Sequence, residues 1–113
     1  MSNYIKLDHI GIILKEEFIE PMGLTMNSLA NAIGVPPNRI HGIVHGLRGM
    51  TADTDLRLTH FFGLTQGFFL RIQNRYEMTM ARRELAKQIK MITPIEYNDD
   101  SFTIARVQTV VRA

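Results

Sequence analysis

Apolar residues recur at helical spacing in five stretches of the chain, and glycines separate these stretches. The residue just beyond a helix often adopts a left-handed backbone, which only glycine does cheaply, and four glycines stand in such places: Gly23, Gly34, Gly46 and Gly63. Residues that suit a helix start precede the stretches: Asp8, Thr25, Thr51 and Thr65 as N-caps, and Pro36 and Pro37 in a first turn. The pattern predicts five helices, the first ending near Glu20, the second near Ile33 and the fifth near Lys90.

The composition changes after Lys90. Thr93 and Pro94 break the helical pattern, and residues 98–101 have the composition of a turn. Residues 102–111 are rich in β-branched side chains, which is compatible with a short strand, a strand-like arm or a poorly ordered tail. We therefore expect one helical domain over residues 1–90 and a C-terminal extension of uncertain structure over residues 91–113.

Composition limits the kind of protein this can be. With 113 residues, no cysteine and a net charge of +2, the chain fits one domain without disulfides or thiolate metal ligands. Charged residues interrupt the N-terminal apolar residues, and no apolar run approaches the roughly 20 residues of a membrane span. A cytoplasmic protein without a membrane partner is the expectation.

Residues 25–46, TMNSLANAIGVPPNRIHGIVHG, have the form of a helix-turn-helix motif. The inner face of its first helix is predicted to consist of Leu29, Ala30 and Ile33, with the turn at Gly34 and Val35. The inner stripe of its second helix is predicted to consist of Ile40, Ile43, Val44 and Leu47, at spacings of three and four.

The opposite face of the second helix carries short polar side chains. At 100° per residue, the positions pointing away from the apolar stripe are Asn38, His41, Gly42 and His45, with Arg39 on the flank. A major groove admits such a helix, and asparagine and arginine can form paired hydrogen bonds with base edges. Base-reading residues lie toward the N-terminus of this helix, which favours Asn38 and His41, while Arg48 suits a phosphate.

Other interpretations of these residues stay open. Asn38 can serve only as a first-turn hydrogen-bonding residue. His41 and His45 have the spacing of a metal-binding pair, but no third ligand or zincin pattern accompanies them, so no metal or other cofactor is expected. Gly42 either lets DNA approach closely or is a helix-interior glycine that costs about 1 kcal/mol of stability.

Beyond this motif, the sequence resembles the HigA-type antitoxins, also called virulence-associated protein I, within the Xre or lambda-repressor-like group. The resemblance covers roughly residues 7–84, in the order HIGIILKEEFIEPMGLT, LANAIGVPPNRIHGIVHGLRGMTADTDLRLTHFFG and FFLRIQNRYEMTMARRE. It implies an all-α, five-helix lambda-repressor-like domain with a C-terminal extension. It also implies a homodimer that binds a palindromic operator upstream of its own operon and, in many members, neutralises a small ribonuclease toxin.

The resemblance extends to residue roles. The DNA-binding set that we expect from motif and resemblance together is Asn27, Ser28, Pro37, Asn38, Arg39, His41, Gly42, His45 and Arg48. Several positions depart from the family pattern, among them Ile10, Ile12, His41, Gly42, Leu47 and Thr59, and three departures bear on specific roles. Met26 replaces a phosphate-holding glutamine, Phe69 replaces a tryptophan while keeping aromatic packing, and Asp55 stands where small apolar residues are usual. A buried, unpaired Asp55 would be costly, so we expect it to be exposed or paired.

Three functions remain in consideration. The first is a DNA-binding antitoxin and autorepressor, whose toxin would meet the acidic first helix around Glu16, Glu17 and Glu20. The second is a solitary regulator of the same fold, and the third is a protein-interaction module that has lost DNA binding. No catalytic residues are predicted, because no nucleophile constellation, carboxylate pair or phosphate-cradling loop is evident. Apolar residues that continue past the core favour dimer contacts there: Leu85, Ile89, Ile92, Ile95 and Phe102.

Overall fold

The computed structural model describes residues 6–96, in which helices joined by loops are the regular secondary structure and no strand occurs. It contains α1 (Ile10–Leu14), the π-helical turn η1 (Lys15–Ile19), α2 (Met26–Ile33), α3 (Pro37–Val44), α4 (Ala52–Phe62) and α5 (Phe68–Lys90). The expected all-α architecture of five helices is confirmed. Residues 102–111, for which the sequence leaves three possibilities, lie outside the described residues.

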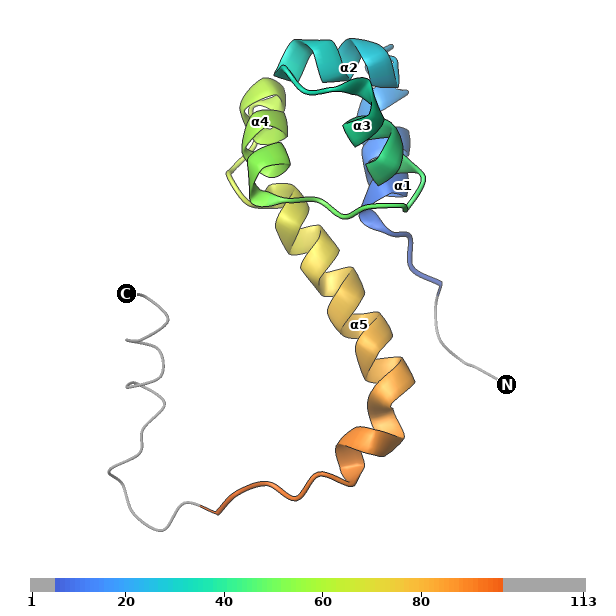
Figure 1. The fold of residues 1–113 in the computed structure, drawn as a ribbon, viewed down its shortest axis with the longest axis vertical. Helices are drawn as coiled ribbons and strands as arrows, with labels where there is room; N and C mark the ends of the chain where they lie inside the picture. Colours follow the sequence, from blue (N-terminus) through green and yellow to red (C-terminus); the bar gives the residue numbers. More distant parts are fainter. Residues whose placement is uncertain (1–5, 97–113) are drawn as a thin grey trace.

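The first four helices surround one apolar core, which the start of α5 closes (Figure 1). Its fully buried side chains include Leu14, Leu29, Ile40, Leu58 and Phe69. Each is expected to contribute about 1.5–3 kcal/mol by leaving water. Phe69 packs in an aromatic cluster with Phe18, whose ring centroid lies 5.2 Å away, so the aromatic role expected of this position is confirmed.

The contact between α1 and α3 depends on Gly11. A Cβ atom on Gly11 would overlap the backbone carbonyl oxygen of Ile43 and would also crowd the carbonyl carbon of that residue. The two helices therefore approach more closely than any side chain at position 11 would allow. The sequence pattern gave no indication of this role, because Ile43 is 32 positions away (43 − 11) along the chain.

Several helix boundaries agree with the sequence pattern. Thr25 caps α2 in a reciprocal capping box with Ser28, and Thr51 caps α4 by accepting a hydrogen bond from the Thr54 N–H. Pro37 occupies the first turn of α3. The four glycines singled out at helix ends all have positive φ, and α5 ends at Lys90 as expected.

The expected cap of the first helix is wrong. His9, not Asp8, caps α1, because its ring Nδ1 accepts a hydrogen bond of 3.0 Å from the Gly11 N–H. The helix then widens into η1, where a backbone bond of 2.9 Å from Glu20 to the Lys15 carbonyl spans five residues. The helical region still ends close to Glu20, as the pattern predicts.

The expected cap of the fifth helix is also wrong. Gly67, not Thr65, precedes α5, and no side chain nearby in sequence caps it. Instead Asp55, on α4 and only 1% exposed, accepts hydrogen bonds from the N–H groups of Gly67 at 2.6 Å, Phe69 at 2.9 Å and Leu70 at 3.1 Å. Of the two expected states of Asp55, exposed or paired, the structure shows the second: the carboxylate is buried and hydrogen-bonded.

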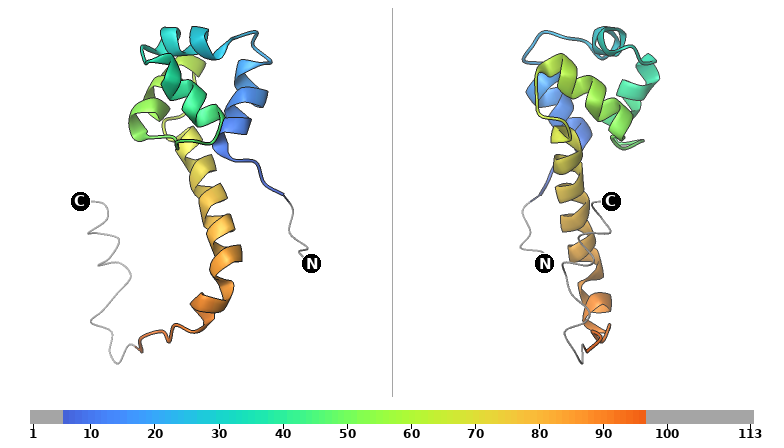
Figure 2. Two further views of the ribbon diagram at one scale, coloured as in Figure 1. Left: turned by 45° about the vertical axis from the view of Figure 1, so that its right-hand side comes forward. Right: turned by 90° about the vertical axis from the view of Figure 1, so that its left-hand side faces the viewer.

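The C-terminal half of α5 projects beyond the other helices (Figure 2). Only Phe69 on this 23-residue helix is buried, while Leu85 is 41% and Ile89 is 55% exposed. Among the described helices, none combines the length and apolar character that crossing a membrane requires.

Candidate nucleic-acid interface

Helices α2 and α3 form the helix-turn-helix unit, joined through Gly34 with a φ of +72°. The predicted inner residues of α2, Leu29, Ala30 and Ile33, are all buried, as are Ile40, Ile43 and Val44 of α3. The expectation for Leu47 is wrong. Because α3 ends at Val44 and the chain turns at Gly46, Leu47 lies in the following loop and is 84% exposed.

Three residues of the predicted DNA-binding set are linked on the outer surface of the motif. His41 Nε2 donates to Asn27 Oδ1 at 3.1 Å, which joins α3 to α2. His45 Nδ1 lies 2.8 Å from the His41 carbonyl oxygen, and the two imidazole rings stack with centroids 6.2 Å apart. Asn38 is exposed one turn earlier on the same helix.

Two residues of the set have local roles that limit what they can offer a ligand. The hydroxyl and the N–H group of Ser28 are both hydrogen-bonded to Thr25 in the capping box. Pro37 has no N–H, so it cannot donate a backbone hydrogen bond to a phosphate. Met26 is half-buried and packs against the core.

Arg39 is held by an ion pair. Its Nη1 lies 2.8 Å from Asp53 Oδ1, and Arg57 Nε lies 2.8 Å from the same oxygen. Hydrogen bonding and charge from Arg57 first, and from Arg39 second, hold the pKa of the Asp53 carboxyl below its usual range. Arg57 also donates to the carbonyl oxygens of Ile33 and Gly34, so α4 holds the end of α2 in place.

The loop after α3 is fixed at both ends. The stem of Arg48 lies over Gly42, where an added Cβ would meet Arg48 Cγ at 3.0 Å. This gives the mid-helix glycine a packing role that neither sequence interpretation included. Further along, Met50 donates its N–H to Gln73 Oε1 at 2.6 Å and accepts from Gln73 Nε2 at 3.0 Å, which joins the loop to α5.

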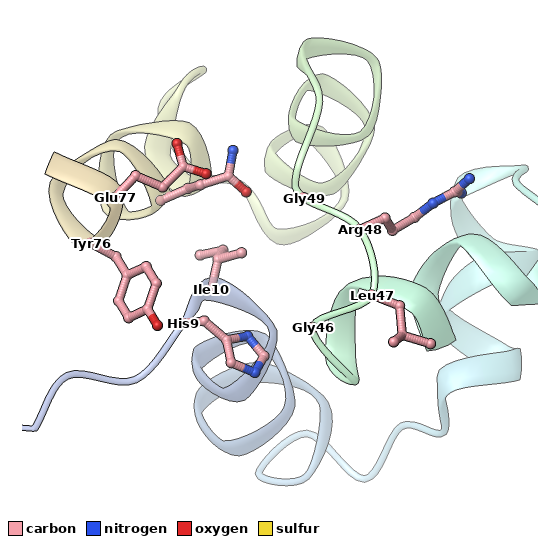
Figure 3. A pocket seen from close by; sticks show the side chains of 9 residues that line it. His9, Ile10, Gly46, Leu47, Arg48, Gly49, Tyr76 and Glu77 are labelled. Carbon is pink, nitrogen blue, oxygen red and sulfur yellow. The ribbon is translucent and has the colours of Figure 1, made fainter. Parts of the chain in front are cut away.

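A shallow cleft of about 390 Å³ lies between this loop, the start of α1 and α5 (Figure 3). Its wall includes His9 beside Gly46, and Tyr76 and Glu77 from α5, whereas the Arg48 side chain extends away from α5 toward the helix-turn-helix unit. Arg48 thus lies over Gly42 of α3 and lines one hollow together with Arg39. Within residues 6–96, no group of three or more His, Asp or Glu side chains could hold a metal ion.

Gln73 is a positioning residue that the sequence pattern did not reveal. It lies among exposed polar residues of α5 and has no distinctive spacing relative to the motif. Only the fold brings its amide to Met50, 23 positions away along the chain.

Comparisons with known proteins agree with this geometry. The chain is 44% identical to virulence-associated protein I of Dichelobacter nodosus over 94 residues, which is 83% of the chain and 86% of the relative. It is 34% identical to antitoxin HigA-1 of Vibrio cholerae serotype O1 over 86 residues, or 76% and 81% of the two chains. The Pseudomonas aeruginosa antitoxin HigA, solved with the higBA promoter, superposes with a TM-score of 0.74 at 30% identity over 80% of this chain and 100% of that one. No protein-family model matches the chain.

Proposed function

Because the chain belongs to the family of HigA antitoxins and virulence-associated protein I, we propose that it binds operator DNA as a homodimer, represses its own operon and neutralises a small ribonuclease toxin. As a DNA-binding protein it acts in the cytoplasm, and no catalytic role is assigned to it. The observation that carries the proposal is the exposed polar face of α3, supported by buried apolar residues on its other side.

The proposed roles follow from where the side chains lie. Asn38 and His41 reach toward base edges, since they stand on the first two turns of α3. Arg39 and Arg48 flank this face and neutralise phosphates. Arg39 binds Asp53 through Nη1 alone, so its other guanidinium N–H groups are left to donate to a phosphate.

The structure of this face leads to a first prediction, on Asn38. In a fluorescence anisotropy titration with duplex from upstream of the chain's own reading frame, Asn38→Ala is expected to weaken binding by about 1–3 kcal/mol, roughly fivefold to 150-fold. A shuffled duplex, bound through phosphates alone, is expected to lose much less.

Asn74→Ala is the matched control, since Asn74 is exposed on α5, outside this face. Equal losses for both duplexes would remove Asn38 from the base-reading set. Equal, weak binding of both duplexes by the unaltered protein would instead favour a protein-interaction module.

We assign the dimer contact to the projecting half of α5. Leu85 and Ile89 lie one turn apart on it, exposed to solvent, and Met78 extends the same face toward the core. A second copy covers these side chains in the proposed dimer. Six basic and two acidic residues lie between positions 71 and 90. At 100° per residue, Arg71 and Arg82 fall on the same face as this apolar stripe.

A second prediction tests this contact. Leu85→Asp combined with Ile89→Asp is expected to convert the dimer to a monomer in sedimentation equilibrium, because carboxylates would be buried without partners. Lys87→Asp adds a carboxylate on the opposite side of the helix and is expected to leave the dimer intact. A double variant that remains dimeric would place the contact elsewhere.

The proposed toxin surface is the exposed side of η1. Glu16, Glu17 and Glu20 lie there, and π-helical segments are rare and often occur at functional sites. Co-purification with the product of an adjacent short basic reading frame tests whether a toxin exists. Loss of that complex on reversing the three charges would support this location, and an unchanged complex would refute it.

A further inference from the structure

The two histidines on the outer side of α3 are held in defined proton arrangements. A carbonyl oxygen only accepts hydrogen bonds, so His45 must carry a proton on Nδ1 to bind the His41 carbonyl at 2.8 Å. The amide oxygen of Asn27 likewise requires the proton of His41 on Nε2. In its neutral form, His45 therefore presents Nε2 to solvent as a lone pair, which is an acceptor.

This arrangement matters for phosphate binding. The oxygens of a DNA phosphate diester are acceptors and carry negative charge, so a neutral His45 has no donor to offer them through Nε2. Once protonated, the same ring donates from both nitrogens: Nδ1 keeps the His41 carbonyl and Nε2–H becomes free. The position at the C-cap of α3 also suits a cation, because the final carbonyl groups of a helix carry partial negative charge.

We infer that His45 binds a DNA backbone phosphate only as an imidazolium, so that the protein takes up protons when it binds DNA. The inference rests on the proposed function and adds a chemical condition to it. Because protonation sets this condition, the affinity of the protein for DNA is expected to fall as the pH rises.

Among the described residues, no hydrogen bond or ion pair joins His45 to a carboxylate. From α1, the ring of His9 faces Gly46, the residue that follows His45. From α2, the group facing the histidine pair is the neutral amide of Asn27, and on α3 it is the ring of His41. Arg48 lies beside Gly42 in the following loop. From α4, the carboxylate of Asp53 is already bound by Arg39 and Arg57. An incoming phosphate is therefore the anion that this imidazolium is available to meet.

Proton uptake on binding determines how steeply the affinity for DNA changes with pH. Over the pH range in which the free protein has lost the proton and the complex retains it, the logarithm of the association constant falls by up to one per pH unit for each proton taken up. With one His45 in each subunit of a dimer, we expect binding at pH 6 to be about tenfold to hundredfold tighter than at pH 8.

The experiment is the anisotropy titration with the upstream duplex, repeated between roughly pH 6 and pH 8 at one ionic strength. His45→Gln is expected to bind weakly with a flat pH profile, and His45→Lys, a permanent cation, is expected to bind tightly with a flat profile. His60→Gln, which replaces an exposed histidine on α4, is expected to keep the slope of the unaltered protein. His9 is retained in every variant, so its capping role affects all of them equally.

The outcomes separate this inference from the proposed function. Specific binding with no pH dependence, or a slope that persists in His45→Gln, overturns the inference and leaves the DNA-binding function standing. Failure of His45→Lys to raise affinity at pH 8 also overturns it. Absence of specific binding at every pH removes both the inference and the proposed function.

Discussion

Gly11→Ala is expected to lower the free energy of unfolding by about 3 kcal/mol or more, at the upper end of the cost of overpacking a core. The added methyl group would overlap the backbone carbonyl of Ile43, which cannot turn aside as a side chain can. Relief requires α1 and α3 to separate, which opens the core at Ile10 and Ile40. For a domain of this size the melting temperature is expected to fall by roughly 12–24 °C, measurable by circular dichroism.

Gly42→Ala is the matched control within a helix. There the added methyl group meets only the flexible stem of Arg48, and alanine favours the helix by up to about 1 kcal/mol. We therefore expect a stability within about 1 kcal/mol of the unaltered protein. Equal effects at the two positions would show that backbone contact between α1 and α3 is not what Gly11 provides. If Gly11→Ala does not fold at all, the contrast with Gly42→Ala still stands.

Replacement of Asp55 is expected to have the other large effect on stability. Asp55→Ala leaves the N–H groups of Gly67, Phe69 and Leu70 without their acceptor, and the expected loss is about 3–4 kcal/mol in urea unfolding. Asp55→Asn keeps the volume but turns one acceptor into a donor that faces an N–H group, for a loss of about 2–3 kcal/mol.

A local measurement distinguishes this role from general core packing. In Asp55→Asn, hydrogen exchange of the Phe69 and Leu70 amides is expected to accelerate more than exchange within α2. Asp53→Asn is the control, because Asp53 lies two positions away on the same helix but is exposed and binds only arginine side chains. Unchanged exchange at Phe69 and Leu70 would contradict the proposed cap.

The sequence was sufficient to predict features that depend only on neighbouring residues, such as helix caps and turns. Thr25, Gly34 and Pro37 each act within a turn or two of their own position, and their residue types indicate those roles directly. The buried stripe of α3 follows from helical spacing up to Val44. Leu47 continues the same spacing, but the helix ends before it, and spacing alone does not say where a helix stops.

The sequence was insufficient where contacts cross the chain. Asp55 reaches N–H groups 12 to 15 positions away, and Gly11 faces a carbonyl on another helix. Nothing in the neighbourhood of either residue specifies its partner. The same holds for the candidate DNA-binding face: helical spacing gathers Asn38, His41 and His45, but only the packing of α2 on α3 brings Asn27 to His41.

The paired hydrogen bonds between Gln73 and Met50 have a mechanical consequence. They join the loop that carries Arg48 to α5 at Met50. In a dimer held together through α5, the separation of the two reading surfaces would then be set by helices rather than by loop flexibility. Such a dimer would bind only half-sites with one spacing. An added base pair would shift one half-site along the DNA axis and rotate it around that axis, away from its subunit.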